Sequence, residues 1–266
     1  MNAILAVWKR VASQKSLGLV GIGAFLALWE VAPRAGWVNR EFLPEFSAVA
    51  QKFVAYLFDS SFWADVSVTM RAWAIGLAIS IIAGFIVGMI IGLNSFLKRA
   101  TRSTIEFLRP IPSVALVPLA VLLFGLSIES SLMLIVYACF WQVLIQVLYG
   151  VSDIDPVADS TAQVFGLNRL ERIRYVVWPT VLPYLMTGIR LASTVAIILA
   201  ITAELLIGQP GIGYQIGLTQ AGGRVPEMYA LIVATGFIGV AINIGIRALE
   251  RQALKWHPSV TREGVR

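Results

Sequence analysis

Two ionisable residues, Arg190 and Glu204, lie within one long apolar stretch of this 266-residue chain. They are fourteen residues apart, which on a helix separates them by about 21 Å along the axis. Because a bilayer core is about 30 Å thick, both side chains could extend to the two membrane interfaces. Alternatively they line a water-filled route for a solute, as ionisable groups inside helical bundles often do. The sequence leaves both interpretations open.

Other chemistry has little support in the residue types present. The chain holds one histidine, His257, and one cysteine, Cys139, so it lacks a metal-ligand cluster and a nucleophile beside a base. A single cysteine also excludes an intrachain disulfide. No Gly-x-x-x-x-Gly-Lys-Ser/Thr phosphate loop occurs in the sequence, which argues against ATP binding of the P-loop type. We therefore expect no enzymatic activity and no cofactor or metal bound by this chain.

The composition is that of an integral membrane protein, with 58% hydrophobic and 14% charged residues. Hydropathy predicts six spans, and five is the alternative because Pro118 interrupts the short third run. The first run lacks a small-x-small cleavage site and is interpreted as an uncleaved anchor. The predicted spans are Ser16–Ala32, Ala72–Leu93, Ile111–Leu126, Ser130–Val151, Thr180–Ala203 and Met228–Ile246.

The distribution of lysine and arginine predicts the orientation in the membrane. With the N-terminus inside, fifteen of these residues fall on inner segments and five on outer segments, while Arg190 lies within a span. An excess of positive residues marks the cytoplasmic side, so both termini are expected in the cytoplasm. This bias also accounts for the net charge of +6, and no nucleic-acid partner is expected.

Three connecting or ridge-forming patterns predict how the elements pack. Residues 46–57 have apolar positions at helical spacing and predict a packing helix that lies on the outer leaflet or on the membrane domain of the chain itself. The basic segment Asn94–Arg109 is expected to be partly helical. The second span carries a small residue at every fourth position, which favours close packing within the chain over contact with a second subunit. These small residues are Ala72, Gly76, Ser80, Gly84, Gly88 and Gly92.

The only long polar connection with a recognisable pattern lies between the fourth and fifth predicted spans. It contains the stretch Ser160–Leu167 and ends at Trp178 and Pro179. The pattern predicts a short helix that Gly166 stops by adopting a left-handed conformation. A second helix follows and is expected to end near Pro179.

This spacing resembles the cytoplasmic E-A-A, three residues, Gly, nine residues, Ile-x-Leu-Pro loop of bacterial ABC importer permeases. Ala162, Gly166 and Pro179 are in register, and Val176 takes the Ile place. Ser160 stands in place of the usual Glu and Thr161 in place of the first Ala, so the contact made by that Glu is not carried over. Further similarity, to the taurine, sulfonate, nitrate and bicarbonate branch, extends over roughly residues 43–250. It includes Arg109–Leu119, Leu122–Gly125, Asp155–Pro156, Gly188–Leu191, Ala203–Leu205 and Pro210–Tyr214.

The resemblance implies an all-α, polytopic membrane protein with about six transmembrane helices, similar to type I ABC importer permeases. It implies one permease domain over residues 1–266, with a cytoplasmic coupling loop at 155–179. The implied coupling residues are Asp159, Ser160, Thr161, Ala162, Val164, Phe165, Gly166, Leu167 and Pro179. An outer gate near Gly211, Gly213 and Tyr214 is also implied, with a simple turn as the alternative. The same resemblance strengthens the pathway interpretation of Arg190 and Glu204.

The implied partners are two cytoplasmic ABC ATPase subunits that use ATP and Mg²⁺, and an external solute-binding protein. A second permease copy in a homodimer is expected in the bacterial inner membrane, and pairing with a paralogue stays open. The preferred substrate class is a small anion such as a sulfonate, nitrate or aromatic acid. The rival function is a self-sufficient secondary transporter or channel, which would predict inverted repeats or buried proton-relay carboxylates. A membrane-embedded enzyme ranks third because catalytic groups are lacking.

Overall fold

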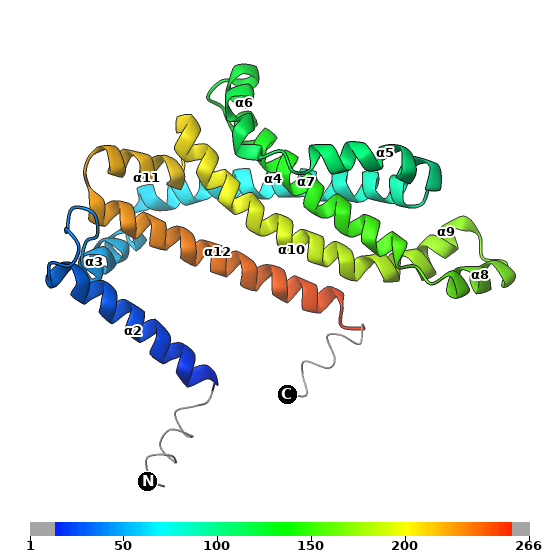
Figure 1. Ribbon diagram of the computed structural model, residues 1–266, viewed down its shortest axis with the longest axis horizontal. Coiled ribbons are helices and arrows are strands. Elements are labelled where there is room, and N and C mark those ends of the chain that lie inside the picture. Colours follow the sequence, from blue (N-terminus) through cyan, green and yellow to red (C-terminus); the bar gives the residue numbers. More distant parts are fainter. Residues whose placement is uncertain (1–13, 257–266) are drawn as a thin grey trace, which may run out of the picture. The chain divides into compact units, whose positions relative to one another are not determined.

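The computed structural model describes residues 14–256, and these residues form helices joined by short turns without any strand (Figure 1). The all-α prediction is confirmed. Five helical segments in this range are long and apolar enough to cross a membrane, and a bent helix pair raises the count to six. The segments are α2 (Gln14–Arg34), α4 (Ser60–Gly92), α7 (Ile128–Ser152), Arg169–Gly208, which contains α10 (Trp178–Ala203), and α12 (Val225–Ala253). Lys9, Arg10, His257, Arg262 and Arg266 lie outside the described residues.

The predicted third span, Ile111–Leu126, is the one that differs from a straight helix. A 3₁₀ turn, η1 (Ser113–Leu116), leads into the eight-residue α6 (Val117–Phe124), which is bent by 81° from α5 (Ser95–Leu108). Pro112 and Pro118 in this stretch, and Pro110 just before it, remove backbone donors and favour breaks at their preceding residues. The predicted interruption is therefore present, and this run together with α5 forms either a broken span or a re-entrant loop, in keeping with the predicted count of six or five. The prediction of a helix within Asn94–Arg109 is confirmed by α5.

The described chain divides into two compact units, and each is described by itself below. The first unit contains residues up to 60 together with 216–234. Here α3 (Phe46–Leu57) confirms the predicted amphipathic helix, with Val49 only 1% exposed. The indole of Trp29 donates a hydrogen bond to the Pro44 carbonyl (3.0 Å), and the Glu30 carboxylate accepts one from the Ser47 amide (2.8 Å). These contacts fix the turn between α2 and α3.

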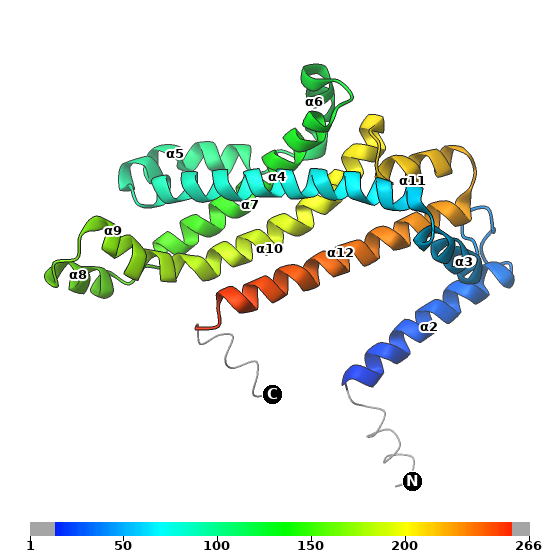
Figure 2. The ribbon, with the colours of Figure 1, turned by 180° about the vertical axis from the view of Figure 1, so that it is seen from behind.

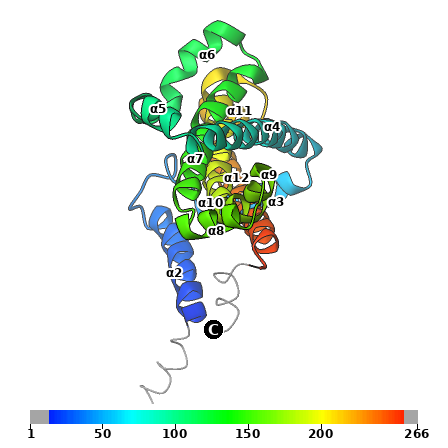
Figure 3. The same cartoon turned by 90° about the vertical axis from the view of Figure 1, so that its right-hand side faces the viewer.

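The second unit contains residues 61–215 and those from 235 onward, and the small-residue ridge of α4 packs on α7 within it (Figures 2 and 3). A Cβ atom built on Gly84 would lie 2.8 Å from the Val143 Cβ, and one on Gly88 would lie 2.8 Å from the Val147 Cβ. Gly76 approaches Ile135 in the same way. The two helices can approach this closely only because these positions lack side chains. The prediction of intrachain packing is confirmed.

Candidate functional site

The polar connection after α7 begins with a well-capped short helix, α8 (Pro156–Val164). The Asp155 carboxylate accepts a hydrogen bond from the Val157 amide (2.8 Å), and Pro156 occupies the first helical turn. Both features satisfy or remove amide donors that a helix N-terminus leaves open. The Ser160 and Thr161 hydroxyls donate to the carbonyls of Pro156 and Val157 in their own helix, each at 2.7 Å. At these two positions the structure therefore shows hydroxyl groups turned toward the α8 backbone.

Gly166 ends α8 in the conformation predicted from the sequence. Its φ is +77°, its amide donates to the Gln163 carbonyl (2.9 Å), and the Leu167 amide donates to the Ala162 carbonyl (3.0 Å). This is the Schellman arrangement, in which a left-handed residue, usually glycine, closes the helix. Ala162 is 8% exposed and faces the protein, whereas Leu167 is half-buried. The short helix and its glycine stop are confirmed.

The second predicted helix does not end near Pro179. After Asn168 caps α9 (Arg169–Arg172), the chain continues through a wide π turn, η2 (Ile173–Val177), directly into α10. Pro179 lies in the first turn of α10. Proline has no backbone N–H to donate. It is tolerated here because the π turn before it interrupts the regular α-helical hydrogen-bond pattern at this point. The predicted break is thus a change of helical pitch, and α9 continues through η2 into the span that follows.

An ion pair joins the two short helices of this connection. The Arg172 guanidinium donates to the Asp159 carboxylate through Nε (3.0 Å) and Nη2 (2.6 Å), and both side chains are 29% exposed. These hydrogen bonds hold the pKa of Asp159 below its ordinary value. A depressed pKa means that the pair stabilises the fold at neutral pH and is lost only as pH falls through that lowered value. The orientation of α8 on α9 is therefore fixed at physiological pH.

We expect Arg172→Ala to loosen α8 without unfolding the chain, because a partly exposed ion pair contributes only about 1 kcal/mol or less. The expected result is faster exchange of the α8 backbone amides, with unchanged yield of folded protein. Arg169→Ala is the matched control, since it removes the same charge from the same helix and leaves the pair with Asp159. Equal exchange rates for the two variants, measured by hydrogen exchange and mass spectrometry on the purified protein, would show that the ion pair does not hold α8.

The outward face of α8 and its cap is apolar. Val157, Val164 and Phe165 are 70%, 86% and 79% exposed, respectively. A shallow hollow of about 400 Å³ runs beside them and is lined by Pro156, Val157, Ser160, Thr161 and Val164. Large apolar side chains grouped at this level of exposure are typical of a surface that another protein covers. Figure 1 shows α8 and α9 at the N-terminal end of α10.

The two ionisable residues of α10 lie in different surroundings. Arg190 donates to the Glu250 carboxylate of α12 (3.3 Å) and is 39% exposed at its side chain. Glu204 is 2% exposed and accepts hydrogen bonds from the Thr69 hydroxyl and the Gly213 amide, both at 2.9 Å. Glu204 is therefore enclosed by other parts of the protein. The structure does not bring Arg190 and Glu204 together.

The residues predicted for an outer gate lie in and just after a glycine-containing turn. Gly208 and Gly211 have φ values of +81° and +144°, and α11 (Ile212–Ala221) begins directly afterwards. Gly213 is buried and Tyr214 is half-buried in the first turn of α11. Gly211 thus lies in the turn and Gly213 lies within α11, and a gating function stays a prediction. Among residues 14–256, no three His, Cys, Asp or Glu side chains come together as metal ligands would.

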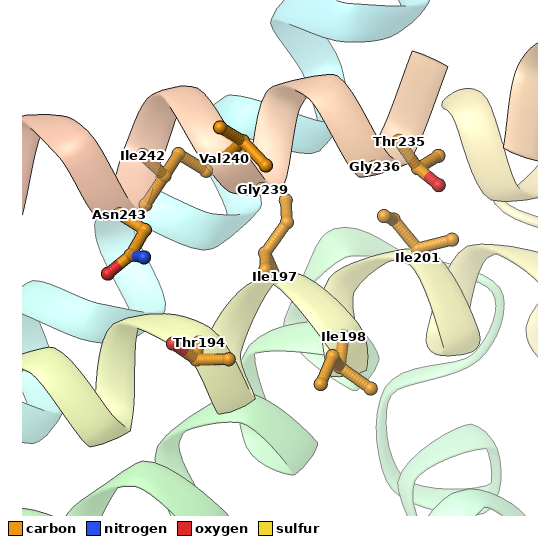
Figure 4. A pocket seen from close by; sticks show the side chains of 10 residues that line it. All are labelled: Thr194, Ile197, Ile198, Ile201, Thr235, Gly236, Gly239, Val240, Ile242 and Asn243. Carbon is orange, nitrogen blue, oxygen red and sulfur yellow. The ribbon is translucent and has the colours of Figure 1, made fainter. Parts of the chain in front are cut away.

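One cavity between α10 and α12 was not predicted from the sequence. It has a volume of about 370 Å³, and Figure 4 shows Ile197 and Ile201 of α10 facing the glycines of α12. Its lining residues are Thr194, Ile197, Ile198, Ile201, Thr235, Gly236, Gly239, Val240, Ile242 and Asn243. The sequence feature that could have indicated this cavity is the run of small and polar residues within the last span, because small side chains leave room beside a neighbouring helix.

The sequence pattern of one family, described as the binding-protein-dependent transport system inner membrane component, matches residues 76–253. This chain belongs to that family. The matched region runs from Gly76 of the α4 ridge through α8, Gly166 and α10 to the end of α12. The family predicted from the coupling-loop spacing is therefore confirmed.

Curated relatives in this permease family match most of the chain. The taurine transport system permease protein TauC of Escherichia coli (strain K12) is 26% identical over 255 residues, which cover 94% of this chain and 93% of that protein. The putative aliphatic sulfonates transport permease protein SsuC of Bacillus subtilis (strain 168) is 26% identical, covering 91% of this chain and 88% of the relative. The nitrate import permease protein NrtB of Leptolyngbya laminosa is 28% identical, with coverages of 68% and 65%.

Solved structures of ABC transporters share the fold. A chain of a bacterial ABC transporter involved in the import of the acidic polysaccharide alginate superposes with a TM-score of 0.63 at 14% identity, covering 93% of this chain and 99% of that one. A chain of an amino acid ABC transporter gives a TM-score of 0.60 at 16% identity, covering 72% and 94%. The type of helical fold expected from the permease resemblance is thus confirmed.

Proposed function

We propose that this permease is the membrane-spanning subunit of an ATP-driven importer that moves a small anion delivered by a solute-binding protein. The family description itself names transport that depends on a binding protein. The observation that carries the proposal is the α8 segment, a capped helix with an exposed apolar face between two membrane-spanning helices. Such a face is suited to insertion into a groove of a cytoplasmic ATPase subunit.

The proposed pathway for energy follows the covalent structure of the chain. The coupling segment is continuous with α10, so movement of α8 by an ATPase subunit is transmitted to a membrane span. ATP binding and hydrolysis by two such subunits would bias the spans between inward-facing and outward-facing states. The permease itself contributes no bond chemistry. A second copy of this chain completes the route for the solute in the proposed assembly.

The preference for a small anion rests on the relatives and on the α10–α12 cavity. The relatives are named for taurine, aliphatic sulfonates, nitrate and bicarbonate, and each of these solutes carries an oxyanion group. The cavity presents the hydroxyl groups of Thr194 and Thr235 and the amide of Asn243. The Thr194 hydroxyl donates to the Arg190 carbonyl (3.3 Å), so the side-chain amide of Asn243 is the neutral donor that can hydrogen-bond an oxyanion, without holding it as tightly as a fixed cation would. Arg190 and the Gly211–Tyr214 segment stay predicted pathway and gate residues.

Reconstitution of the permease with its ATPase and solute-binding protein tests the proposed function. We expect the three proteins to co-purify, and anion uptake into proteoliposomes to require all three together with ATP and Mg²⁺. A self-sufficient secondary transporter or channel would instead mediate uptake with the permease alone. Uptake by the permease alone, at the rate of the complete mixture, would therefore favour that rival function.

The proposed orientation places both termini and the Asp153–Pro179 connection in the cytoplasm. Cys139 is fully buried, and a Cys139→Ser background removes the only thiol of the chain. We expect an impermeant maleimide to label Asn39→Cys, but not Asn168→Cys, in intact cells. Both asparagines are exposed, so permeabilised cells should label both variants. Labelling of Asn168→Cys in intact cells would overturn the orientation.

A further inference from the structure

The carboxylate of Glu204 is enclosed where three helices meet. Glu204 begins a π turn, η3 (Glu204–Gly208), at the end of α10, and its side chain lies between α4 and the start of α11. One oxygen, Oε2, accepts from both the Thr69 hydroxyl and the Gly213 amide. The other oxygen, Oε1, is buried without a hydrogen-bond partner in the described structure. Burying an acceptor without a partner costs free energy, so the hydrogen bonds made by Oε2 must offset the cost of placing this carboxylate in the interior.

The Thr69 hydroxyl extends the network to a second amide. Its oxygen accepts a hydrogen bond from the Ile212 amide at 3.1 Å, and Thr69 is 0% exposed. Glu204 and Thr69 therefore satisfy two successive amides, those of Ile212 and Gly213, in the first turn of α11. Helix N-termini leave these donors without partners in the helix itself, and buried ones require side-chain acceptors. The network thus combines a helix cap with a contact across to α4.

The two glycines of the turn leave the space that this network needs. A Cβ atom on Gly211 would overlap the Glu204 carboxylate, and one on Gly213 would overlap the Ile201 carbonyl. Gly211 also has a φ of +144°, which side-chain-bearing residues rarely adopt. The close approach of backbone to carboxylate therefore depends on glycine at both positions. This close contact explains why glycines stand seven and nine residues after Glu204.

A second contact holds the same turn on α7. Gln209 is 6% exposed, its side-chain oxygen accepts from the Ser131 hydroxyl (2.7 Å), and its side-chain nitrogen donates to the Ser127 carbonyl. The turn is consequently attached on one side to α4 through Thr69 and on the other side to α7. Both attachments are polar contacts in the interior. Because hydrogen bonds are directional, they resist a shift of the turn along α4 or α7.

We propose that Glu204 is a positioning residue that, with Thr69, clamps the turn Gly208–Gly213 and the start of α11 onto α4. The turn then moves together with this end of α4 and α7 as one body. What the clamp needs from residue 204 is a hydrogen-bond acceptor of the right length, and the negative charge is dispensable. This distinguishes the clamp from a pathway function, in which the charge would act on the solute.

Hydrogen exchange of the amides in residues 208–215, followed by mass spectrometry on the purified full-length permease, tests the clamp directly. We expect Glu204→Ala and Thr69→Val to accelerate exchange of the Ile212 and Gly213 amides at least about tenfold, because each removes a buried acceptor. Thr69→Ser and Glu204→Gln keep the acceptors and should exchange like the unaltered protein. Thr202→Val is the matched control, since the exposed Thr202 hydroxyl contacts only the Ile198 carbonyl among the described hydrogen bonds.

A double-mutant cycle adds a readout that general destabilisation would not give. Because the Thr69 hydroxyl donates to the Glu204 carboxylate and so joins the two caps in one network, the Thr69→Val/Glu204→Ala double variant should exchange no more than about threefold faster than the faster single variant. Multiplication of the two single effects would show independent contributions and overturn the clamp. Unchanged exchange in Thr69→Val would also overturn it.

Uptake by the reconstituted complex separates the clamp from the pathway interpretation, and this arm alone rests on the proposed function. We expect Glu204→Gln to transport within about twofold of the unaltered protein and Thr69→Val to lose at least about fivefold. Reduced uptake in Glu204→Gln with normal amide exchange would show that the charge matters and would overturn the proposal. If the unaltered complex fails to import an anion, the proposed function fails, and the exchange measurements still decide the clamp.

Discussion

Gly166→Val should leave the permease folded but uncouple ATP hydrolysis from uptake. At a φ of +77° a β-branched residue is strained by about 1 to 3 kcal/mol. A Cβ atom at this position would meet nothing within 4 Å, so the strain is in the backbone and not in packing. The chain relieves it by leaving the left-handed conformation, which breaks the Schellman cap and redirects α8. We expect the amount of solute moved per ATP hydrolysed to fall about 5-fold to 150-fold.

The matched control is Gly36→Val, at the end of α2. Gly36 has a φ of +76° and nothing within 4 Å of a built Cβ atom. It closes its helix with the same pair of Schellman hydrogen bonds, so valine imposes comparable backbone strain outside the proposed coupling segment. Gly166→Asn gives a second comparison, because asparagine tolerates the left-handed region better than valine does. Solute uptake and solute-stimulated hydrolysis are measured in parallel. Normal values of both for Gly166→Val would contradict the coupling function of this segment.

Gly84→Leu should strongly destabilise the folded protein. A Cβ atom there would already lie 2.8 Å from the Val143 Cβ and 3.1 Å from the Phe140 carbonyl oxygen, so leucine would force α4 and α7 apart. Overpacking of this kind costs about 3 kcal/mol, a large share of the total stability of a typical domain. We expect aggregated material on size-exclusion chromatography and a lower thermal midpoint for any folded fraction.

Gly245→Leu is the control for this substitution. Gly245 is an exposed helical glycine of α12 with nothing within 4 Å of a built Cβ atom, and leucine there adds the same apolar volume. It should purify like the unaltered protein. Equal monodisperse yields of the two leucine variants would show that the α4 ridge does not require its close contact with α7.

The sequence predicted best where a local pattern has one physical solution. A small residue at every fourth position of α4 leaves a groove that only another helix can fill, and Ile135, Val143 and Val147 fill it. Gly166 was likewise predictable, because a short helix followed by glycine has a common left-handed stop. The family membership followed from this loop and its neighbours in their order along the chain.

Prediction was poorer where the outcome depended on partners distant in sequence. Hydropathy treated residues 111–126 as one span, although the prolines break that run into separate short turns. Pro179 indicated a helix end, and only the π turn before it explains why the helix continues. The environment of Glu204 could not be predicted either, because Thr69 is 135 residues away in the sequence. Spacing within α10 alone could not identify that partner.

The unbroken helical path from Arg169 to Gly208 has a mechanical consequence. Its 40 residues extend for about 60 Å, so a tilt of about 5° at the α8 end would displace the far end by roughly 5 Å. Both extremities are wide π turns, Ile173–Val177 and Glu204–Gly208, where helices can absorb or release a residue of register. The segment can therefore act as a lever, because a tilt imposed beside α8 reaches the Glu204 end as a displacement of several ångströms, and a π turn lies near each end where its pitch changes.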